Sequence, residues 1–139
     1  MIQKELKNGS LSRKKGVNAY ILTINNYDGL LLVTSLINGN MRTPKIYALY
    51  NLIDWLNLKF EDINIPKKYI NNSPLYSNAW LSGFIEADGP FSVITTSKNP
   101  KVECKFELSQ RQNDHNGRSS LNFLENISHF VCNFLQLNL

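Results

Sequence analysis

Apolar residues recur at helical spacing near the middle of the chain, at Trp80, Leu81, Phe84 and Ile85. Gly83 and Ala87 lie four positions apart, so they share one face of this predicted helix and allow a second backbone to approach it closely. Ser77 or Asn78 can cap the start of the helix, and Gly89 is a natural residue for its end. The pattern therefore predicts a helix with an apolar stripe and a face of small side chains.

The apolar period changes from helical to alternating after this helix. Residues 91–96 are predicted to form a strand, residues 98–101 a turn, and residues 102–112 a second strand. In the second strand, Cys104 and the apolar residues at alternate positions face one side, while charged and polar residues face the other. We therefore expect an antiparallel hairpin that packs one face against helices, with Cys104 as a small core residue.

The N-terminal part of the chain carries a different set of patterns. Residues 1–16 are polar and basic, and we expect a solvated lead-in rather than a specific phosphate contact. A β-branched and aromatic run at 19–24 predicts a strand, and residues 25–29 have the composition of a turn. The apolar run at 30–37 fits a strand or a helix, so a hairpin and a strand–helix unit are both open.

Two further helices and a linker complete the expected architecture. An apolar stripe over residues 45–56 predicts a helix, with Thr43 as its cap and Pro44 in its first turn. Residues 58–76 lack a helical period and contain two prolines, which is typical of a linker. Residues 120–139 repeat apolar side chains on one face and predict a closing helix.

Composition adds bounds on the class of protein. The 139 residues are enough for one ordinary domain, and 42% of them are hydrophobic, so disorder is not expected. The net charge of +4 permits a nucleic-acid partner without requiring one. Cys104 and Cys132 are far apart and suggest neither a disulfide framework nor a zinc site. Because no signal peptide or membrane-spanning run is visible, we expect an intracellular protein without a membrane partner.

Asp88 has the most unusual chemical setting in the chain. It occupies the last turn of the predicted central helix, where a carboxylate faces the negative end of the helix dipole at a cost of about 0.3–1 kcal/mol. A hard divalent cation would offset this cost, because carboxylate and carbonyl oxygens are its preferred ligands. Glu86 lies about 200° away around the helix and cannot share that site. On this one acid alone, a helix with a polar last turn is the simpler interpretation.

The run Leu81 to Gly89, which reads Leu-Ser-Gly-Phe-Ile-Glu-Ala-Asp-Gly, resembles the LAGLIDADG motif of the homing endonucleases position by position. Residues 37–46 and 52–57 also resemble the end of the first repeat in two-motif, organelle-encoded members. The resemblance implies an α+β fold in which antiparallel β-hairpins form a DNA-facing saddle backed by helices. It further implies an enzyme, a metal-dependent nuclease that hydrolyses phosphodiester bonds of double-stranded DNA.

The same resemblance implies that the saddle is incomplete. Residues 1–57 resemble the closing part of a first repeat, residues 58–76 a linker, and residues 77–139 the opening part of a second repeat. One motif is present where two-motif members have two. We therefore expect a truncated protein whose motif helix needs either a missing first-repeat half or self-association through Gly83 and Ala87.

Roles for individual residues are also implied by the resemblance. Asp88 and Gly89 are the implied ligands of a Mg²⁺ ion, and Gln110 is implied to position water near it. Gln110 would lie on the strand face of Phe106 unless a bulge or the strand end turns it. Arg42 is the implied basic catalytic residue, although it would belong to the site of the other half. The implied DNA-reading side chains are Ser92, Ile94, Thr96, Lys98, Lys105, Glu107, Ser109 and Arg111.

Three functions are open on the sequence. The first is a mitochondrial, intron-encoded homing endonuclease, which the resemblance favours. The second is an RNA maturase that binds intron RNA and assists group I intron splicing. The third is an inactive remnant. Absence of a first motif supports the third, because double-strand cleavage in the family needs one acid from each of two motif helices.

Overall fold

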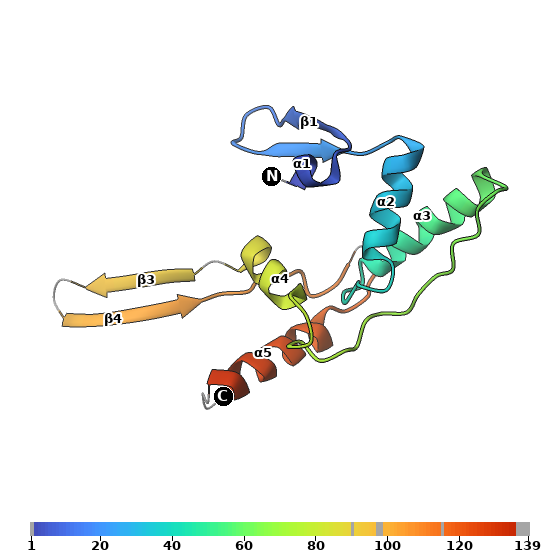
Figure 1. Ribbon diagram of the computed structural model, residues 1–139. Helices are drawn as coiled ribbons and strands as arrows, with labels where there is room; N and C mark the ends of the chain where they lie inside the picture. The colour runs from blue at the N-terminus through green and yellow to red at the C-terminus, as the bar shows by residue number, and fades with distance from the viewer. Residues whose placement is uncertain (1, 90, 97–98, 115, 136–139) are drawn as a thin grey trace. The chain divides into compact units, whose positions relative to one another are not determined.

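The computed structural model describes residues 2–89, 91–96, 99–114 and 116–135, and within them no helix is long and apolar enough to span a membrane. The described elements, in chain order, are α1 (Ile2–Leu6), β1 (Ser10–Arg13), β2 (Tyr20–Thr23), α2 (Tyr27–Ile37), α3 (Ile46–Lys59), α4 (Trp80–Asp88), β3 (Phe91–Thr96), β4 (Asn99–Phe106) and α5 (Leu121–Leu135) (Figure 1). The strands form two separate antiparallel hairpins, which confirms the α+β class. The chain divides into two compact units, residues 1–41 with 45–71 and residues 42–44 with 72–139.

After α1, the first unit contains a hairpin that the sequence pattern does not predict. Strand β1 pairs with β2, so that Ser10 lies opposite Thr23 and Arg13 lies opposite Tyr20. The prediction of a solvated lead-in over residues 1–16 misses the strand at 10–13, although the side chains of that strand are exposed, while the predicted strand at 19–24 is confirmed by β2. The physical reason is that β1 has little strand propensity of its own and is stabilised by main-chain hydrogen bonds to its partner.

Helices α2 and α3 form the helical part of the first unit. The apolar run at 30–37, which fits either element on the sequence, is helical, and the Asn26 side chain caps it by accepting a hydrogen bond from the Gly29 amide at 2.9 Å. Helix α3 begins after Lys45 without a side-chain cap, so the prediction that Thr43 caps it is wrong. The buried residues of α3 recur at helical spacing and are Ile46, Leu49, Ile53 and Leu56.

Residues 60–71 have no helix or strand, as their composition predicts, but side-chain hydrogen bonds hold them to the first unit. The buried Asn38 amide donates to the Pro66 carbonyl at 2.8 Å and accepts from the Lys68 amide at 3.1 Å. Asn57 makes a similar pair of bonds with the backbone of Ile65, at 3.0 and 2.8 Å. Each asparagine replaces the main-chain partner that an irregular segment lacks.

The second unit is built from α4, the β3–β4 hairpin and α5. Aromatic rings of α4 and α5 lie in contact, with the Phe123 ring centroid 5.6 Å from that of Trp80 and 5.3 Å from that of Phe84. Leu81 and Ile127 are buried beside this cluster. The predicted helix at 80–89 and the predicted closing helix are therefore confirmed over their described residues, and their apolar stripes meet.

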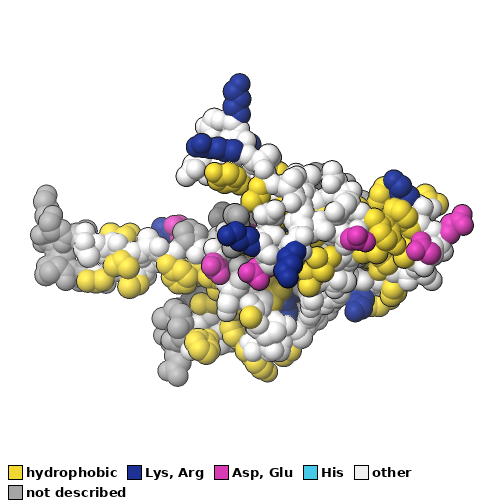
Figure 2. Space-filling view, turned by 45° about the horizontal axis from the view of Figure 1, so that its top comes forward, with side chains coloured by type: hydrophobic (Ala, Val, Ile, Leu, Met, Phe, Trp, Pro, Cys, Tyr) yellow, Lys and Arg dark blue, Asp and Glu magenta, His cyan; other side chains and the backbone are white. Residues whose placement is uncertain are grey.

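The β3–β4 hairpin departs from the prediction in length and in burial. Strand β4 starts at Asn99, inside the predicted turn, and ends at Phe106 rather than at residue 112. Phe91 is 73% exposed, Val93 is 67% exposed and Cys104 is exposed, so the prediction of a half-buried hairpin with a core cysteine is wrong. The cause is that two strands make no second layer to cover their apolar face, and Figure 2 shows hydrophobic side chains along this hairpin.

Candidate metal centre and nucleic-acid interface

The end of α4 and the residues after β4 meet because of the hairpin register. Helix α4 ends at Asp88, and β3 starts three positions later at Phe91, which lies opposite Phe106 at the end of β4. Antiparallel pairing thus returns the chain to the point where the hairpin began. Gln110, four residues after Phe106, donates a hydrogen bond from Nε2 to Oδ2 of Asp88 at 2.9 Å.

The early end of β4 explains why Gln110 reaches Asp88. A strand that continued to residue 112 would place Gln110 on the face of Phe106. Because the ladder stops at Phe106, the backbone of residues 107–110 is free of the strand period, and the amide turns toward the carboxylate. An amide N–H group next to a carboxylate also offsets part of the unfavourable helix-dipole interaction of Asp88.

Gly89 closes the helix end tightly against the hairpin. Its N–H donates to the Ile85 carbonyl at 2.7 Å, and its φ of −113° is a conformation open to any residue. A Cβ at this position would lie 2.6 Å from Cε2 of Phe106 and 2.9 Å from the Ile85 carbonyl oxygen. Glycine is therefore required here for space rather than for a left-handed backbone.

The donors at the end of α4 fit a hard divalent cation. Asp88 is exposed, so its carboxylate is open to solvent, and main-chain carbonyls of the last helical turn lie near it. Across the described ranges, no group of three or more His, Cys, Asp and Glu side chains gathers into a metal cluster. One exposed carboxylate matches Mg²⁺, which keeps several waters and is held by one or two carboxylates together with substrate phosphates.

Arg42 is held inside the protein at the start of α4. Its side chain is 8% exposed, Nη1 donates to the Ser73 carbonyl at 2.6 Å, and Nη2 donates to the Ser73 hydroxyl at 2.7 Å. Its Cζ lies 5.4 Å from the Trp80 ring centroid, and burial lowers the pKa of the guanidinium. Trp80 and Asp88 are separated by about 12 Å along the helix axis. Arg42 thus contacts the opposite end of α4 from the one that carries Asp88.

The predicted DNA-reading residues divide into three groups. Ser92 and Ile94 share one face of the hairpin with Lys105, since Ser92 lies opposite Lys105. Glu107, Ser109 and Arg111 follow the end of β4, and Lys105 Nζ forms an ion pair with Glu107 Oε1 at 2.9 Å. Thr96 belongs to β3, and its side chain and residue Lys98 lie outside the described part.

Glu103 is a residue of the same face that the sequence reasoning left out. It lies opposite Ile94 and is exposed. The alternation along residues 102–112 already places it two positions before Lys105, so the strand period is the signal that identifies it.

The face of small side chains on α4 is open. Gly83 and Ala87 are both exposed, and a Cβ built on Gly83 meets no atom within 4 Å. Because α4 buries Leu81 on its other side, this face is the part of the helix at which a further element can pack.

Comparison with known proteins assigns a family to the segment that contains α4, the β3–β4 hairpin and α5. Residues 81–136 match the family model described as LAGLIDADG endonuclease. The chain belongs to this family. The LAGLIDADG motif lies on α4, with Asp88 at its end, and the matched segment continues through the β3–β4 hairpin into α5. The family consists of nucleases that generally use a divalent metal.

Several curated relatives extend the similarity beyond the motif segment. The chain is 34% identical over 122 residues to the intron-encoded DNA endonuclease aI3 of Saccharomyces cerevisiae, covering 77% of this chain and 29% of that protein. It is 34% identical over 121 residues to the probable intron-encoded endonuclease 4 of Neurospora crassa, covering 81% and 22%. It is 30% identical over 92 residues to the intron-encoded RNA maturase bI4 of S. cerevisiae, covering 65% and 13%. The chain thus spans less than a third of the length of these relatives, and no solved structure matches it significantly.

Proposed function

We propose that this protein is part of a homing endonuclease that hydrolyses phosphodiester bonds of double-stranded DNA with the help of a divalent cation. The observation that carries the proposal is the pairing of Asp88 with Gln110 at 2.9 Å, at the end of a LAGLIDADG helix and at the base of an exposed hairpin. The two endonuclease relatives support it by similarity.

Asp88 and the backbone carbonyl of Gly89 would hold the cation, for which we propose Mg²⁺. When bound, such an ion supplies positive charge beside the scissile phosphate and lowers the pKa of a water molecule. Gln110 uses its N–H group on Asp88, which leaves its carbonyl oxygen to orient the attacking water. The water oxygen would then bond to phosphorus as its proton passes to bulk water, and the bond from phosphorus to the leaving sugar oxygen would break as that oxygen takes a proton from solvent.

The hairpin supplies the proposed DNA-reading surface. A two-stranded ribbon fits the major groove of B-DNA, where base edges are distinguishable. Lys105 and Ser92 face one side of that ribbon, with Arg111 after its end, and they offer hydrogen-bond donors to bases and phosphates. A purely solvated face is the alternative role of these residues.

A complete double-strand site needs a second acid. We propose that it comes from a partner motif helix that packs on Gly83 and Ala87, either in a missing first-repeat half or in a second copy of this chain. The proposed catalytic role of Arg42 stays a prediction. Because its guanidinium is buried against Ser73 and Trp80, the contribution that fits its contacts is to position α4. We also propose a mitochondrial origin, since one relative is named as a cox1 intron-2 protein.

The decisive test compares Asp88→Ala with Glu86→Ala. Both residues are exposed acids of α4 two positions apart, so the variants have the same change in charge on the same helix. Duplex DNA spanning the insertion site of the host intron is incubated with each protein in Mg²⁺ and in Ca²⁺. We expect Mg²⁺-dependent cutting by wild type and Glu86→Ala, and loss of cutting by Asp88→Ala with binding retained.

Three other results would change the assignment. Cutting that survives in Asp88→Ala would remove this residue from the metal site. Binding of intron RNA and stimulation of splicing that survive in Asp88→Ala, without DNA cleavage, would favour the RNA maturase alternative, which the similarity to maturase bI4 supports. If wild type binds DNA and never cuts it, the proposed cleavage by this chain is wrong and the inactive alternative is favoured.

A further inference from the structure

The last turns of α3 carry apolar side chains that lie open to solvent. Trp55 is 43% exposed and Leu58 is 85% exposed, and because they are three positions apart in the helix they share one face. Beyond the helix, the Phe60 ring centroid lies 6.2 Å from that of Trp55 and 4.4 Å from that of Tyr27. We call Tyr27, Trp55, Leu58 and Phe60 the α3 patch. Neighbouring exposed apolar side chains of this kind are typical of a surface that contacts another molecule.

Three carboxylates lie beside the α3 patch. Partial burial and the charges of Asp62 and Asp28 raise the pKa of Tyr27, which places both acids near its hydroxyl. Glu61 lies between Phe60 and Asp62 in the chain. All three acids are exposed, and among the described residues none of the three forms an ion pair. Figure 2 shows hydrophobic side chains gathered at this end of α3, with acidic side chains beside them.

The charge of this region is opposite in sign to that of the whole chain. The chain carries a net charge of +4, whereas residues 55–62 together with Asp28 contain three acids and one cation, Lys59. The Lys59 Nζ atom lies 4.7 Å from the Trp55 ring centroid and 5.8 Å from that of Phe60, so these rings already attract an ammonium group. Because the carboxylates next to them repel phosphate groups and attract cations, the α3 patch favours a cationic occupant over a nucleic acid.

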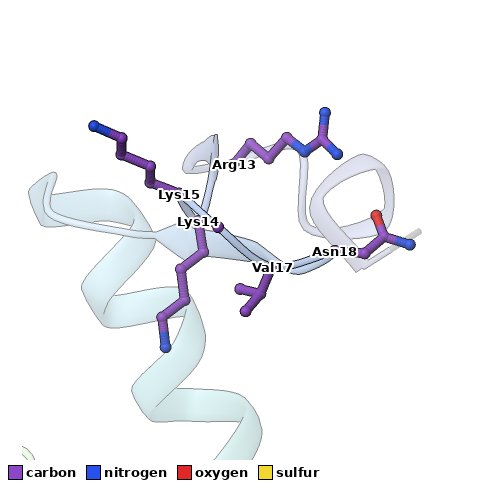
Figure 3. Close-up of a pocket in the computed structure, with 6 residues that line it drawn as sticks. Arg13, Lys14, Lys15, Val17 and Asn18 are labelled. Carbon is purple, nitrogen blue, oxygen red and sulfur yellow. The ribbon is translucent and has the colours of Figure 1, made fainter.

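A second copy of this chain also offers a cationic element, the loop that joins β1 to β2. The residues of this loop that line an open hollow are Arg13, Lys14, Lys15, Gly16, Val17 and Asn18. Figure 3 shows its three cationic side chains pointing away from one another, whereas Asp28 and Asp62 both lie near one phenol group. Diverging cations cannot all meet these two carboxylates, and the single valine of the loop cannot cover both Trp55 and Leu58. A separate partner that carries several apolar side chains next to its cations is the better match.

We propose that the α3 patch docks a cationic, amphipathic helix of another protein. Its apolar side chains would pack on Trp55 and Leu58, since a helix face with side chains three positions apart is suited to packing against a second helix. Its lysine or arginine side chains would lie against Asp28, Glu61 and Asp62. The docking surface belongs to the first unit, outside the matched motif segment, and is independent of the proposed function.

The test measures binding of the full chain to a synthetic amphipathic helical peptide of lysine and leucine, followed by fluorescence anisotropy. The same peptide with glutamate in place of lysine tests the requirement for positive charge. A version with serine in place of leucine tests the requirement for apolar contact. We expect the lysine–leucine peptide to bind wild type although both molecules have a positive net charge, and the other two peptides to bind more weakly.

The charge variant of the protein is Glu61→Gln/Asp62→Asn. Its control is Glu5→Gln/Glu125→Gln, which removes the same charge from exposed acids elsewhere in the chain. We expect the charge variant to raise Kd by about 1.5 to 5 times for each carboxylate removed, as for exposed ion pairs, and the control to leave Kd unchanged.

The apolar variant is Leu58→Ser, and its control is Ile2→Ser, since Ile2 is 70% exposed. Leu58→Ser should raise Kd by about tenfold, because the peptide loses apolar contact area at this position, and the control should bind like wild type. Circular dichroism checks that every variant is folded.

Other results would overturn the proposal. If wild type fails to bind the lysine–leucine peptide, or if the controls weaken binding as much as the patch variants, the α3 patch does not dock a cationic helix. Equal binding of the glutamate–leucine peptide would show that apolar contact alone is recognised. If self-association measured by sedimentation equilibrium is lost both in Leu58→Ser and in a variant with glutamine at the three cations of the β1–β2 loop, the occupant is a second copy of this chain. DNA cleavage is tested separately by Asp88→Ala, so failure of the docking proposal leaves the proposed function standing.

Discussion

At the scale of single residues, the site depends on small side chains as much as on the acid. Asp88 is recognisable from the motif, but its contact with Gln110 exists because Gly89 lets the hairpin pack against the helix end. The sequence pattern predicts that Gly89 ends the helix, and a glycine that ends a helix usually has a left-handed backbone conformation. The structure instead requires glycine because the Phe106 ring occupies the space of a side chain.

This difference predicts opposite effects for two alanine substitutions in one segment. Gly89→Ala should destabilise the protein by about 1–3 kcal/mol, because its Cβ would clash with backbone and ring atoms. Gly83→Ala should stabilise it by about 0.5–1 kcal/mol, because Gly83 is in the interior of α4 and its Cβ meets nothing within 4 Å. Urea unfolding measures both free energies. Equal changes of the same sign would contradict the packing described for Gly89.

At the scale of elements, contacts at its first residue hold α4 in place. Asn78 Oδ1 accepts a hydrogen bond from the Trp80 amide at 2.9 Å, which satisfies a donor at the helix start. Arg42 adds two hydrogen bonds to Ser73 and lies against the Trp80 ring. A residue nearly 40 positions earlier in the chain therefore helps to place the motif helix, which no local pattern indicates.

The buried position of Arg42 predicts a large effect from a substitution that keeps its charge. Arg42→Lys removes the planar group that reaches both Ser73 atoms, so the free energy of unfolding should fall by about 1–3 kcal/mol. Arg111→Lys is the control, since Arg111 is exposed and the change should lie within about 0.5 kcal/mol. Tryptophan fluorescence during urea unfolding reports both values. A similar small change in both variants would show that the Arg42 contacts contribute little to stability.

At the scale of the whole molecule, the two compact units are each held by their own contacts. The first unit is held by the buried apolar residues of α3 and by the hydrogen bonds of Asn38 and Asn57 to segment 60–71. The second is held by the aromatic contacts between α4 and α5. The predicted boundaries of the two repeats stay a prediction, because the compact units describe contacts rather than ancestry. Exposed apolar side chains on β3 and the open face of α4 show that the second unit has surfaces suited to further packing.

Those surfaces predict self-association of the isolated chain. The weight-average mass measured by sedimentation equilibrium should rise with protein concentration toward twice the monomer mass of 15.9 kDa. Gly83→Arg should keep it monomeric, because a long charged side chain prevents a second helix from approaching that face. Asn126→Arg on the exposed side of α5 serves as the control and should associate like wild type. A monomer at all concentrations for wild type would favour a missing first-repeat half as the partner of α4.

The sequence by itself determined the family motif, the helix that carries it and the strand that follows, because these depend on residues close together in the chain. It also pointed to Asp88 and Gln110, but through resemblance, since no local pattern brings an acid and an amide 22 positions apart into contact. Only the tertiary structure decided that β4 ends at Phe106, that Gln110 donates to Asp88 and that Arg42 is buried. It likewise decided that residues 10–13 pair with β2 and so present a basic loop. The physical reason is that strand ends, burial and pairing depend on partners distant in sequence, whereas helical periodicity is set by neighbours.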